Sequence, residues 1–406
     1  MVHMVPVKGQ VPLHHHGRVI WILAGEASGD VIGARLMQAL HRHDPSLVFA
    51  GLGGGRMEAL GLRSLFPMRE LSIMGFVEII PRLKALSQRL LEAEQDIELR
   101  RPDLVITIDS PGFSFRLLRR IAPLGMRRLH YVAPQVWAWR EKRLRHYKGL
   151  WDRLLCLFPF EPEWFAQRGF EGRFVGHPVL QSGVTHGVAE RFYMRHDVER
   201  DSRILLLMPG SRRSEIPRLM PIFKKMVTQL HRYYPKLSVV VPATPLMAPL
   251  VRKMLASWEC QPIIVTDLHD KHDAFAAADC ALTKSGTSTL ELAMAYVPMA
   301  VTYRVNPISA FIARRLLKVP YVAMVNLLAG REVVPELLQE RCTPQCLAQT
   351  VKELMDNPEK AKAQREAYTV VLEKLAPTGG RTPSDAAAEE VIELLNTPLS
   401  ALRERE

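Results

Sequence analysis

The sequence predicts an α/β protein made of two doubly wound domains, each with a mostly parallel sheet covered by helices. Its length of 406 residues suits two domains of roughly 200 residues each. Short apolar runs alternate with longer amphipathic segments, which is typical of a parallel sheet with helical crossovers. Both halves begin alike, because residues 18–24 and 203–208 are apolar runs that lead through a glycine-bearing turn into a helix. We expect the two domains to face each other across a cleft lined by the carboxyl ends of their strands, where such sheets bind ligands.

The first half contains further apolar runs that we interpret as strands, at residues 47–50, 104–108, 128–132, 153–157 and 173–175. Gly176-His177-Pro178 then interrupts the pattern, and a loosely patterned stretch follows. We therefore place a domain boundary after residue 178. The resulting division is a flexible extension (1–17), a first domain (18–178), a second domain (179–356) and a group of C-terminal helices (357–406).

The second half repeats the alternation after its opening run. We expect strands at residues 237–241, 263–265, 280–283 and 299–302. From about Pro344 onward the pattern is helical, and the last amphipathic segment covers residues 386–395. No tandem sequence repeat is visible, so the similarity between the halves is one of architecture.

Composition excludes several classes of protein. Apolar residues make up 48% of the chain and charged residues 24%, which is ordinary for a globular protein. No segment approaches the roughly 20 apolar residues of a membrane span, and the N-terminus lacks the apolar core of a secretory signal. The five cysteines form no disulfide framework, which suits a cytoplasmic protein. Cys342 and Cys346 have no further ligands beside them, so we expect no metal site, and we interpret the run His14–His16 as part of a disordered tail.

The net charge of +12 is concentrated in the first half. Residues 1–180 carry 25 Lys and Arg against 17 Asp and Glu, whereas the remainder carries 29 against 25. Anionic lipid headgroups, phosphorylated ligands and nucleic acid are all partners that such a charge favours. The chain shows no RRM, KH or helix-turn-helix signature, which speaks against RNA binding.

Two glycine-bearing turns of the second half suit a nucleotide diphosphate. Gly210 and Ser211 follow a predicted strand, where backbone N–H groups and the Arg212 guanidinium can meet phosphate. In the turn after residue 284, Ser285 can cap the coming helix, and Gly286 and Thr287 offer backbone N–H groups. Glu291 lies one and a half turns further and can accept hydrogen bonds from ribose hydroxyls. The alternatives are a plain turn with a solvated arginine and an ordinary helix cap.

Asp109 is the candidate catalytic base. It ends the apolar run 104–108, so it lies at the carboxyl end of a predicted strand. Transfer of a group to a hydroxyl needs a base that removes the proton as the bond forms, and a partly desolvated carboxylate with a raised pKa suits that task. The alternative interpretation is an aspartate that closes its loop through an Asx-turn.

Residues 62–91 mix apolar and basic side chains, as surfaces that dip into anionic lipid do. The candidate membrane or acceptor contacts are Phe66, Met68, Arg69, Met74, Phe76 and Arg82. The alternative is a core helix whose cationic face is merely solvated. A second mixed segment, residues 131–140, carries Trp137 and Trp139 beside basic residues and can hold a sugar or a base by stacking.

Ten motifs together resemble the lipid-A-disaccharide synthase family. They run in the family's order over nearly the whole chain after residue 18. They are AGEASGD (24–30), GGGRM (53–57), SIMGFVE (72–78), DSPGF (109–113), YVAPQVWAWR (131–140), LFPFEP (157–162), GHP (176–178), PGSRRSEI (209–216), SGTSTLE (285–291) and NLLAGREVVPELLQ (326–339).

This resemblance implies a metal-independent GT-B glycosyltransferase without cofactors, at the cytoplasmic face of the inner membrane of Gram-negative bacteria. It implies transfer from UDP-2,3-diacylglucosamine to 2,3-diacylglucosamine 1-phosphate, called lipid X, with release of UDP. Asp109 matches the family's essential aspartate, and Glu26 and Ser28, beside Gly29, match its N-terminal glycine loop. The residues matching its nucleotide site are Arg212, Ser285, Thr287, Glu291 and Asn326. This chain departs from the usual pattern at Gly55, Gln135 and Lys284, where the family usually has Pro, Ser and Ala.

Two other classes of function stay open at this stage. One is another UDP-sugar enzyme of the same fold, either a 2-epimerase or a transferase acting on lipid-linked peptidoglycan precursors. The other is a non-catalytic basic protein that binds nucleic acid or anionic membranes, whose binding would depend steeply on salt. The ordered glycine turns favour an enzyme. The oligomeric state is open, with a homodimer among the alternatives.

Overall fold

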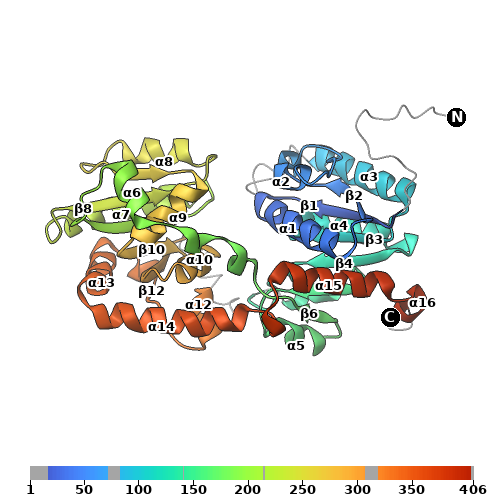
Figure 1. Ribbon diagram of the computed structural model, residues 1–406. Helices are drawn as coiled ribbons and strands as arrows, with labels where there is room; N and C mark the ends of the chain where they lie inside the picture. The colour runs from blue at the N-terminus through green and yellow to red at the C-terminus, as the bar shows by residue number, and fades with distance from the viewer. Residues whose placement is uncertain (1–16, 72–82, 140, 214, 307–318, 404–406) are drawn as a thin grey trace. The chain divides into compact units, whose positions relative to one another are not determined.

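The computed structural model describes residues 17–71, 83–139, 141–213, 215–306 and 319–403. The chain forms two compact units, the first from residues 1–178 with 375–406 and the second from residues 179–374. Each unit contains one six-stranded sheet in which every paired strand is parallel. Helices cover both faces of each sheet (Figure 1). The expected architecture of two doubly wound parallel sheets is confirmed.

The first unit has the strand order β2-β1-β3-β4-β5-β6. Its strands are β1 (Val19–Ala24), β2 (Val48–Leu52), β3 (Leu104–Ile108), β4 (Arg127–Tyr131), β5 (Arg153–Cys156) and β6 (Gly172–Phe174). Its helices are α1 (Ala27–His43), α2 (Gly55–Glu58), α3 (Leu83–Arg100), α4 (Pro111–Ile121), α5 (Glu161–Ala166), α15 (Pro383–Asn396) and α16 (Leu399–Arg403). Alternate residues of β1 face opposite sides, so Trp21 and Leu23 join the core under α3 and α4, and α1 packs on the other side together with α15.

The second unit has the strand order β12-β11-β10-β7-β8-β9. Its strands are β7 (Arg203–Met208), β8 (Leu237–Pro242), β9 (Ile263–Val265), β10 (Cys280–Lys284), β11 (Met299–Tyr303) and β12 (Glu336–Leu338). Its helices are α6 (Ala189–His196), α7 (Ile216–Leu230), α8 (Ala248–Leu255), α9 (Leu268–Ala277), α10 (Ser288–Met294), α12 (Met324–Ala329), α13 (Pro344–Asp356) and α14 (Pro358–Leu375). One core joins the sheet to α7, α8 and α13.

Both sheets contain a point at which the chain reverses its direction of winding. In the first sheet the chain proceeds from β1 to β2 on one side and then to β3 on the other. In the second sheet it proceeds from β7 to β8 and β9, and then returns to β10 on the far side of β7. Ligands of open α/β sheets bind outside the carboxyl ends of the strands at such a point. The two candidate regions are therefore the turns after β1 and β3 and the turns after β7 and β10.

The C-terminal helices, which the sequence analysis set apart as one group, are divided between the units. Helix α14 packs in the second unit, where the Gln364 side chain bonds both backbone groups of Met299 at 2.8 and 3.1 Å. Helix α15 returns to the first unit, where the buried Arg153 guanidinium lies 2.9 Å from carboxylates of both Glu390 and Glu393. None of the helices that the structure describes has the length and apolar character needed to span a bilayer.

Candidate active site

A cleft of about 350 Å³ opens at the carboxyl edge of the second sheet. Its walls come from the turns after β7, β8, β9 and β10 and from the first turns of α9 and α10. Six of the residues assigned to the donor site from the sequence line it, and they are Gly210, Ser211, Ser285, Gly286, Thr287 and Glu291. The structure therefore brings both glycine-bearing turns together at the reversal point between β7 and β10.

The backbone at Gly210 takes a conformation that only glycine adopts without strain, with φ at +114°. A Cβ atom there would lie 2.4 Å from Oε2 of Glu215, so the turn closes directly against this carboxylate. Glu215 is 7% exposed, and its Oε1 lies 3.2 Å from Nζ of Lys284, at the end of β10. This ion pair joins the turn after β7 to the turn after β10.

The turn after β10 differs from the expected helix cap. The Ser285 hydroxyl donates to the carbonyl of Val322 at 2.7 Å, so it does not cap the helix that follows. Helix α10 begins at Ser288, and Thr287 occupies the N-cap position without a side-chain hydrogen bond. At Gly286 a Cβ would meet only Nζ of Lys284 within 4 Å, at 3.8 Å. The backbone at Gly286 is therefore open to close approach by a ligand.

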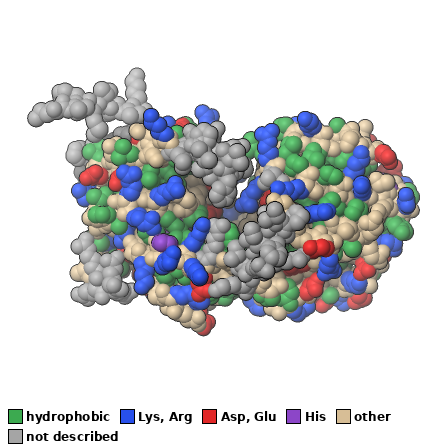
Figure 2. Space-filling view, turned by 180° about the vertical axis from the view of Figure 1, so that it is seen from behind, with side chains coloured by type: hydrophobic (Ala, Val, Ile, Leu, Met, Phe, Trp, Pro, Cys, Tyr) green, Lys and Arg blue, Asp and Glu red, His purple; other side chains and the backbone are tan. Residues whose placement is uncertain are grey.

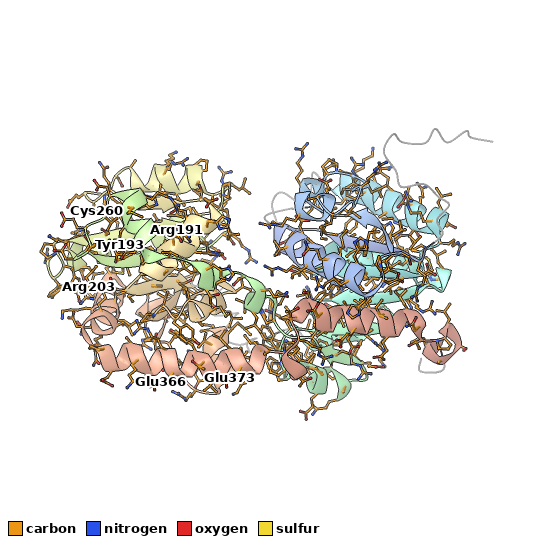
Figure 3. The ribbon with its side chains drawn as sticks, viewed as in Figure 1. Arg191, Tyr193, Arg203, Cys260, Glu366 and Glu373 are labelled. Atoms are coloured by element: carbon orange, nitrogen blue, oxygen red, sulfur yellow. The ribbon has the colours of Figure 1, made fainter. Side chains whose placement is uncertain are left out.

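Glu291 lines the cleft from the first turn of α10. Its Oε2 accepts a hydrogen bond from Nζ of Lys271 at 2.8 Å, and Lys271 itself lines the cleft from α9. Helix α9 is fixed to α6 by the carboxylate of Asp273, which meets Arg191 at 2.7 Å; Arg191 is labelled on α6 in Figure 3. The carboxylate of Glu291 is thus held in place by a cation from a helix that is itself anchored.

Two other residues assigned to the nucleotide site lie elsewhere. The side chain of Arg212 is 69% exposed, forms an ion pair with Glu215 at 3.6 Å and does not line the cleft. Asn326 is fully buried on α12, where its amide bonds Val333, Val334 and Glu336. Glu336 in turn accepts from the backbone N–H of Val322, whose carbonyl holds Ser285. Asn326 therefore supports the turn after β10 through other groups.

The turns after β3 and β4 in the first unit contain strained backbone. Asp109, Ser110 and Val132 have φ values of 51°, 48° and 78°. A positive φ is rare for residues other than glycine, and for a β-branched residue it is an outlier of the kind that gathers at functional sites. The backbone N–H of Asp109 donates to the carbonyl of Tyr131 at 2.9 Å, so the two turns lie side by side.

Asp109 is partly buried, and this environment raises the pKa of its carboxyl group. Desolvation is the main cause, and a hydrogen bond from the backbone N–H of Ser110 opposes it. The Ser110 hydroxyl lies against the turn after β1, since a Cβ on Gly25 would come within 2.6 Å of it. Asp109 therefore lies at the reversal point between β1 and β3.

The N-terminal glycine loop forms the other side of this reversal point. Glu26 and Ser28 are exposed where α1 begins, and Gly29 is buried against Ala24 and the carbonyl of Ile108. A Cβ at Gly29 would lie 3.4 Å from the Cβ of Ala24, an ordinary van der Waals contact, so α1 packs closely on β1 at this residue. Both side chains are exposed at this edge of the first sheet.

The loop with Trp137 is tied to the turn after β5 by a buried carboxylate. Oε1 of Glu161 accepts from Nε1 of Trp137 at 3.0 Å, and its Oε2 accepts from the backbone N–H groups of Leu157 and Phe158 at 2.9 and 3.0 Å. Burial raises the pKa of Glu161 to about 7, although these three donors favour the ionised form. Glu161 was not singled out from the sequence, because only the fold brings it to Trp137.

The candidate membrane segment is only partly described. Met74, Phe76 and Arg82 lie outside the described residues. Phe66 is 4% exposed and packs in the core, with the Arg89 guanidinium over its ring at 5.0 Å. Met68 is half-buried, whereas Arg69 is exposed. Of the described candidates, Arg69 is thus the side chain most exposed to solvent, and Phe66 is part of the hydrophobic core.

Sequence reasoning missed several residues of the cleft. Thr244, Thr266, Asp267 and Lys271 line it from the turns after β8 and β9 and from α9. Asp267 accepts hydrogen bonds from His269 and Asp270 at the start of α9. These residues carry no motif, and only the parallel order of the strands indicates that the turns after β8 and β9 share an edge with those after β7 and β10.

Comparison with known proteins decides the family. Residues 20–390 match the family described as lipid-A-disaccharide synthetase. A lipid-A-disaccharide synthase of Gluconobacter oxydans is 68% identical over 395 residues, which are 97% of this chain and 95% of the relative. The chain belongs to the lipid-A-disaccharide synthase family. As a member of this family of glycosyltransferases, it is an enzyme, which confirms the expectation from the ten motifs.

Solved structures show the fold of this lipid-A-disaccharide synthase family member to be GT-B. MnaA of S. aureus, in a co-structure with UDP, matches with a TM-score of 0.64 at 16% identity and covers 92% of this chain and 95% of its own. MurG of Acinetobacter baumannii matches with a TM-score of 0.54 at 13% identity and covers 93% and 99%. At such low identity the likeness concerns the fold alone.

Proposed function

We propose that this lipid-A-disaccharide synthase family member transfers 2,3-diacylglucosamine from its UDP derivative to the 6-hydroxyl of 2,3-diacylglucosamine 1-phosphate. UDP and a β-1,6-linked disaccharide 1-phosphate are the products. The family supports the reaction, and the cleft at the reversal point of the second sheet supports a nucleotide diphosphate donor. That cleft, with two glycine-bearing turns opening into it, is the observation that carries the proposal.

In this proposal Asp109 is the general base. The acceptor hydroxyl gives its proton to the Asp109 carboxylate while its oxygen forms a bond to the anomeric carbon of the donor. The bond between that carbon and the diphosphate breaks, and UDP leaves with the electron pair, so the configuration inverts. The raised pKa of Asp109 and its strained backbone support this role, since both are features that catalytic groups commonly show.

The second unit then holds the donor. Backbone N–H groups of the turns at Gly210 and Gly286 meet the diphosphate, Arg212 reaches it from the exposed end of the β7 turn, and Glu291 accepts from the ribose hydroxyls. Charge that develops on departing UDP is stabilised by these fixed donors and cations. We propose that the reaction therefore proceeds without a metal ion.

Both substrates carry acyl chains, so we propose that the enzyme works peripherally at the cytoplasmic face of the inner membrane. The basic excess of residues 1–180 supports attraction to anionic lipid. On the face shown in Figure 2, Lys and Arg side chains are spread over both units with acidic side chains among them.

Incubation with UDP-2,3-diacylglucosamine, with and without the acceptor, in detergent and EDTA tests the proposal. We expect mass spectrometry to show the disaccharide 1-phosphate and UDP only when both substrates are present. Conversion of the UDP-sugar without an acceptor would indicate an epimerase or a hydrolase instead. Loss of transfer on adding EDTA, restored by Mg²⁺, would contradict the metal-independent mechanism.

A further inference from the structure

The ammonium group of Lys284 lies where a ligand would meet the turn after β10. Lys284 is the last residue of β10, and its side chain is 19% exposed and lines the cleft. Gly286 leaves its backbone open, and Nζ of Lys284 is 3.8 Å from the position that a Cβ on Gly286 would occupy. A phosphate that approached this backbone closely would therefore be within direct reach of the ammonium.

Two neighbours hold that ammonium in place. Oε1 of Glu215 lies 3.2 Å from it, and the ring of Tyr303 faces it with a centroid distance of 5.6 Å. The Glu215 contact lacks hydrogen-bond geometry, because neither carboxylate oxygen of Glu215 has a hydrogen-bond partner among the described residues. Ammonium hydrogens thus stay available to a second acceptor, and the ion pair sets the position of the charge rather than consuming its donors.

The other cations near the cleft are less suited to this position. Lys271 is hydrogen-bonded to Glu291, on the side where the ribose is expected. Arg212 is 69% exposed, pairs with Glu215 at 3.6 Å and does not line the cleft. Among the described cations, Lys284 alone both lines the cleft and adjoins the open backbone of Gly286.

We propose that Lys284 binds the diphosphate of the donor directly and that Glu215 is the positioning residue that holds its ammonium over the Gly286 turn. This inference rests on the proposed function, since it assumes that the cleft takes a nucleotide diphosphate. It adds a specific contact: a charge-assisted hydrogen bond from Nζ to a phosphate oxygen, made both to the bound donor and to departing UDP.

Calorimetric titration with uridine, UMP and UDP tests this contact on the full-length protein. In Lys284→Met we expect the Kd for UDP to rise about tenfold or more, because a charge-assisted hydrogen bond to phosphate is lost. The Kd for uridine should stay within about twofold, since uridine has no phosphate to contact. Lys284→Arg, which keeps the cation, should recover most of the affinity for UDP.

Two further variants control the experiment. Lys225→Met removes an exposed charge on α7, in the same unit, and should leave the Kd for all three ligands unchanged. Glu215→Gln combined with Lys284→Met removes both charges of the pair, so the buried Glu215 carboxylate is not left with the exposed Arg212 as its remaining ion-pair partner. This double variant should show the same loss of UDP affinity. If the Lys284→Met protein is too unstable to titrate, the double variant tests in its place whether Lys284 contacts the diphosphate.

Two outcomes overturn the assignment: an unchanged Kd for UDP in the Lys284→Met variants, or an equal loss of uridine and UDP binding. The second result would place Lys284 at the nucleoside or in the general stability of the fold. Either would leave the proposed transfer reaction intact. A wild-type protein that bound none of the three ligands would instead contradict the proposed function itself.

Discussion

At the scale of the residue, the candidate base of the first unit, Asp109, lies in a turn with strained backbone. Asp109 and Ser110 both have positive φ, and the turn is fixed by the bond from Asp109 to Tyr131 and by a bond of 2.7 Å from the Ser114 hydroxyl to the Asp109 carbonyl. Strain of this kind persists only where surrounding contacts determine it, and it orients a side chain that would otherwise sample several directions.

Replacing Asp109 by Asn tests its role as the base. The amide keeps the size of the side chain but cannot take a proton, so we expect kcat to fall by about 10²–10⁴-fold. The Kd for UDP should stay unchanged, because the cleft proposed to hold the donor lies in the other unit. Steady-state kinetics and UDP titration of the same preparation check both statements. Turnover close to that of the wild type would remove Asp109 from the base role.

Replacing Gly210 by Ala tests the close approach at the β7 turn. The methyl group would lie 2.4 Å from Oε2 of Glu215, and φ at +114° is strained for alanine. We expect a loss of about 2–3 kcal/mol in unfolding free energy together with weaker UDP binding.

Gly330→Ala is the matched control for this substitution. Gly330 also has a positive φ, at +71°, but a Cβ there would meet nothing within 4 Å. We expect it to lose only about 1 kcal/mol, the ordinary penalty of a left-handed conformation, and to bind UDP normally. Chemical denaturation measures both losses, and equal losses would show that contact with Glu215 adds nothing.

At the scale of the element, Asn326 organises the segment between α12 and β12. Its carbonyl accepts from the backbone N–H groups of Val333 and Val334 at 2.7 and 2.9 Å, and its amide donates to Val334 and Glu336. Asn326→Ala would leave these buried groups without partners, so we expect about 2–4 kcal/mol of destabilisation. Weaker UDP binding should accompany it through the loosened Ser285 turn. Lost UDP binding at unchanged stability would instead indicate direct contact with the nucleotide.

The Glu161 carboxylate ties two loops of the first unit and makes their stability depend on pH. Its pKa is about 7 in the folded protein, above its ordinary value of 4.5, so the folded state binds this proton more tightly than the unfolded state does. The wild type should therefore lose stability relative to Glu161→Gln as pH rises from 4.5 to 7. Denaturation curves across this range measure the difference between the two proteins, and a difference that does not change with pH would contradict the assignment.

The strands of both sheets follow from sequence wherever an apolar run is long and fully buried. Predicted runs 104–108, 203–208 and 263–265 coincide with β3, β7 and β9, and the other predicted strands differ from the observed ones by a residue or two. Strand β12 escaped notice because Glu336–Leu338 is three residues long at the edge of the sheet. The motifs located the two glycine-bearing turns of the cleft, whereas Lys271, Thr244 and the Glu215 contact depend on which turns the sheet order brings together.

At the scale of the whole molecule, the second unit is one continuous stretch of chain. Residues 179–374 contain its entire sheet and every residue that lines the cleft. We expect this stretch, expressed alone, to fold and to bind UDP with a Kd within about tenfold of the full-length value, but to transfer no sugar. Circular dichroism and calorimetry check the fold and the binding, and a fragment that stayed unfolded would show that the first unit is needed for its stability.

The first unit is assembled from two separate stretches of chain. Contacts between residues far apart in the sequence hold these stretches together. Helix α15 packs against β4, and Arg153 of β5 is 3% exposed beside the carboxylates of Glu390 and Glu393. A buried guanidinium without those partners is strongly destabilising. The periodicity of the sequence predicts helix α15, but it does not show that α15 packs against the first unit. For that reason the sequence analysis assigned residues 357–406 to a separate group of helices.

The two passages of the chain between the units run beside each other. The N–H of His177 donates to the carbonyl of Leu375 at 3.0 Å, and Gly176 has φ at +83° where a Cβ would strike Pro377 at 2.6 Å. The second unit is thus inserted into the chain of the first unit, and the points where the chain leaves and re-enters the first unit are adjacent. A short peptide joining residue 178 to residue 375 would close the first unit into a single uninterrupted polypeptide, and the second unit could be exchanged for that of another GT-B protein at these same two joints.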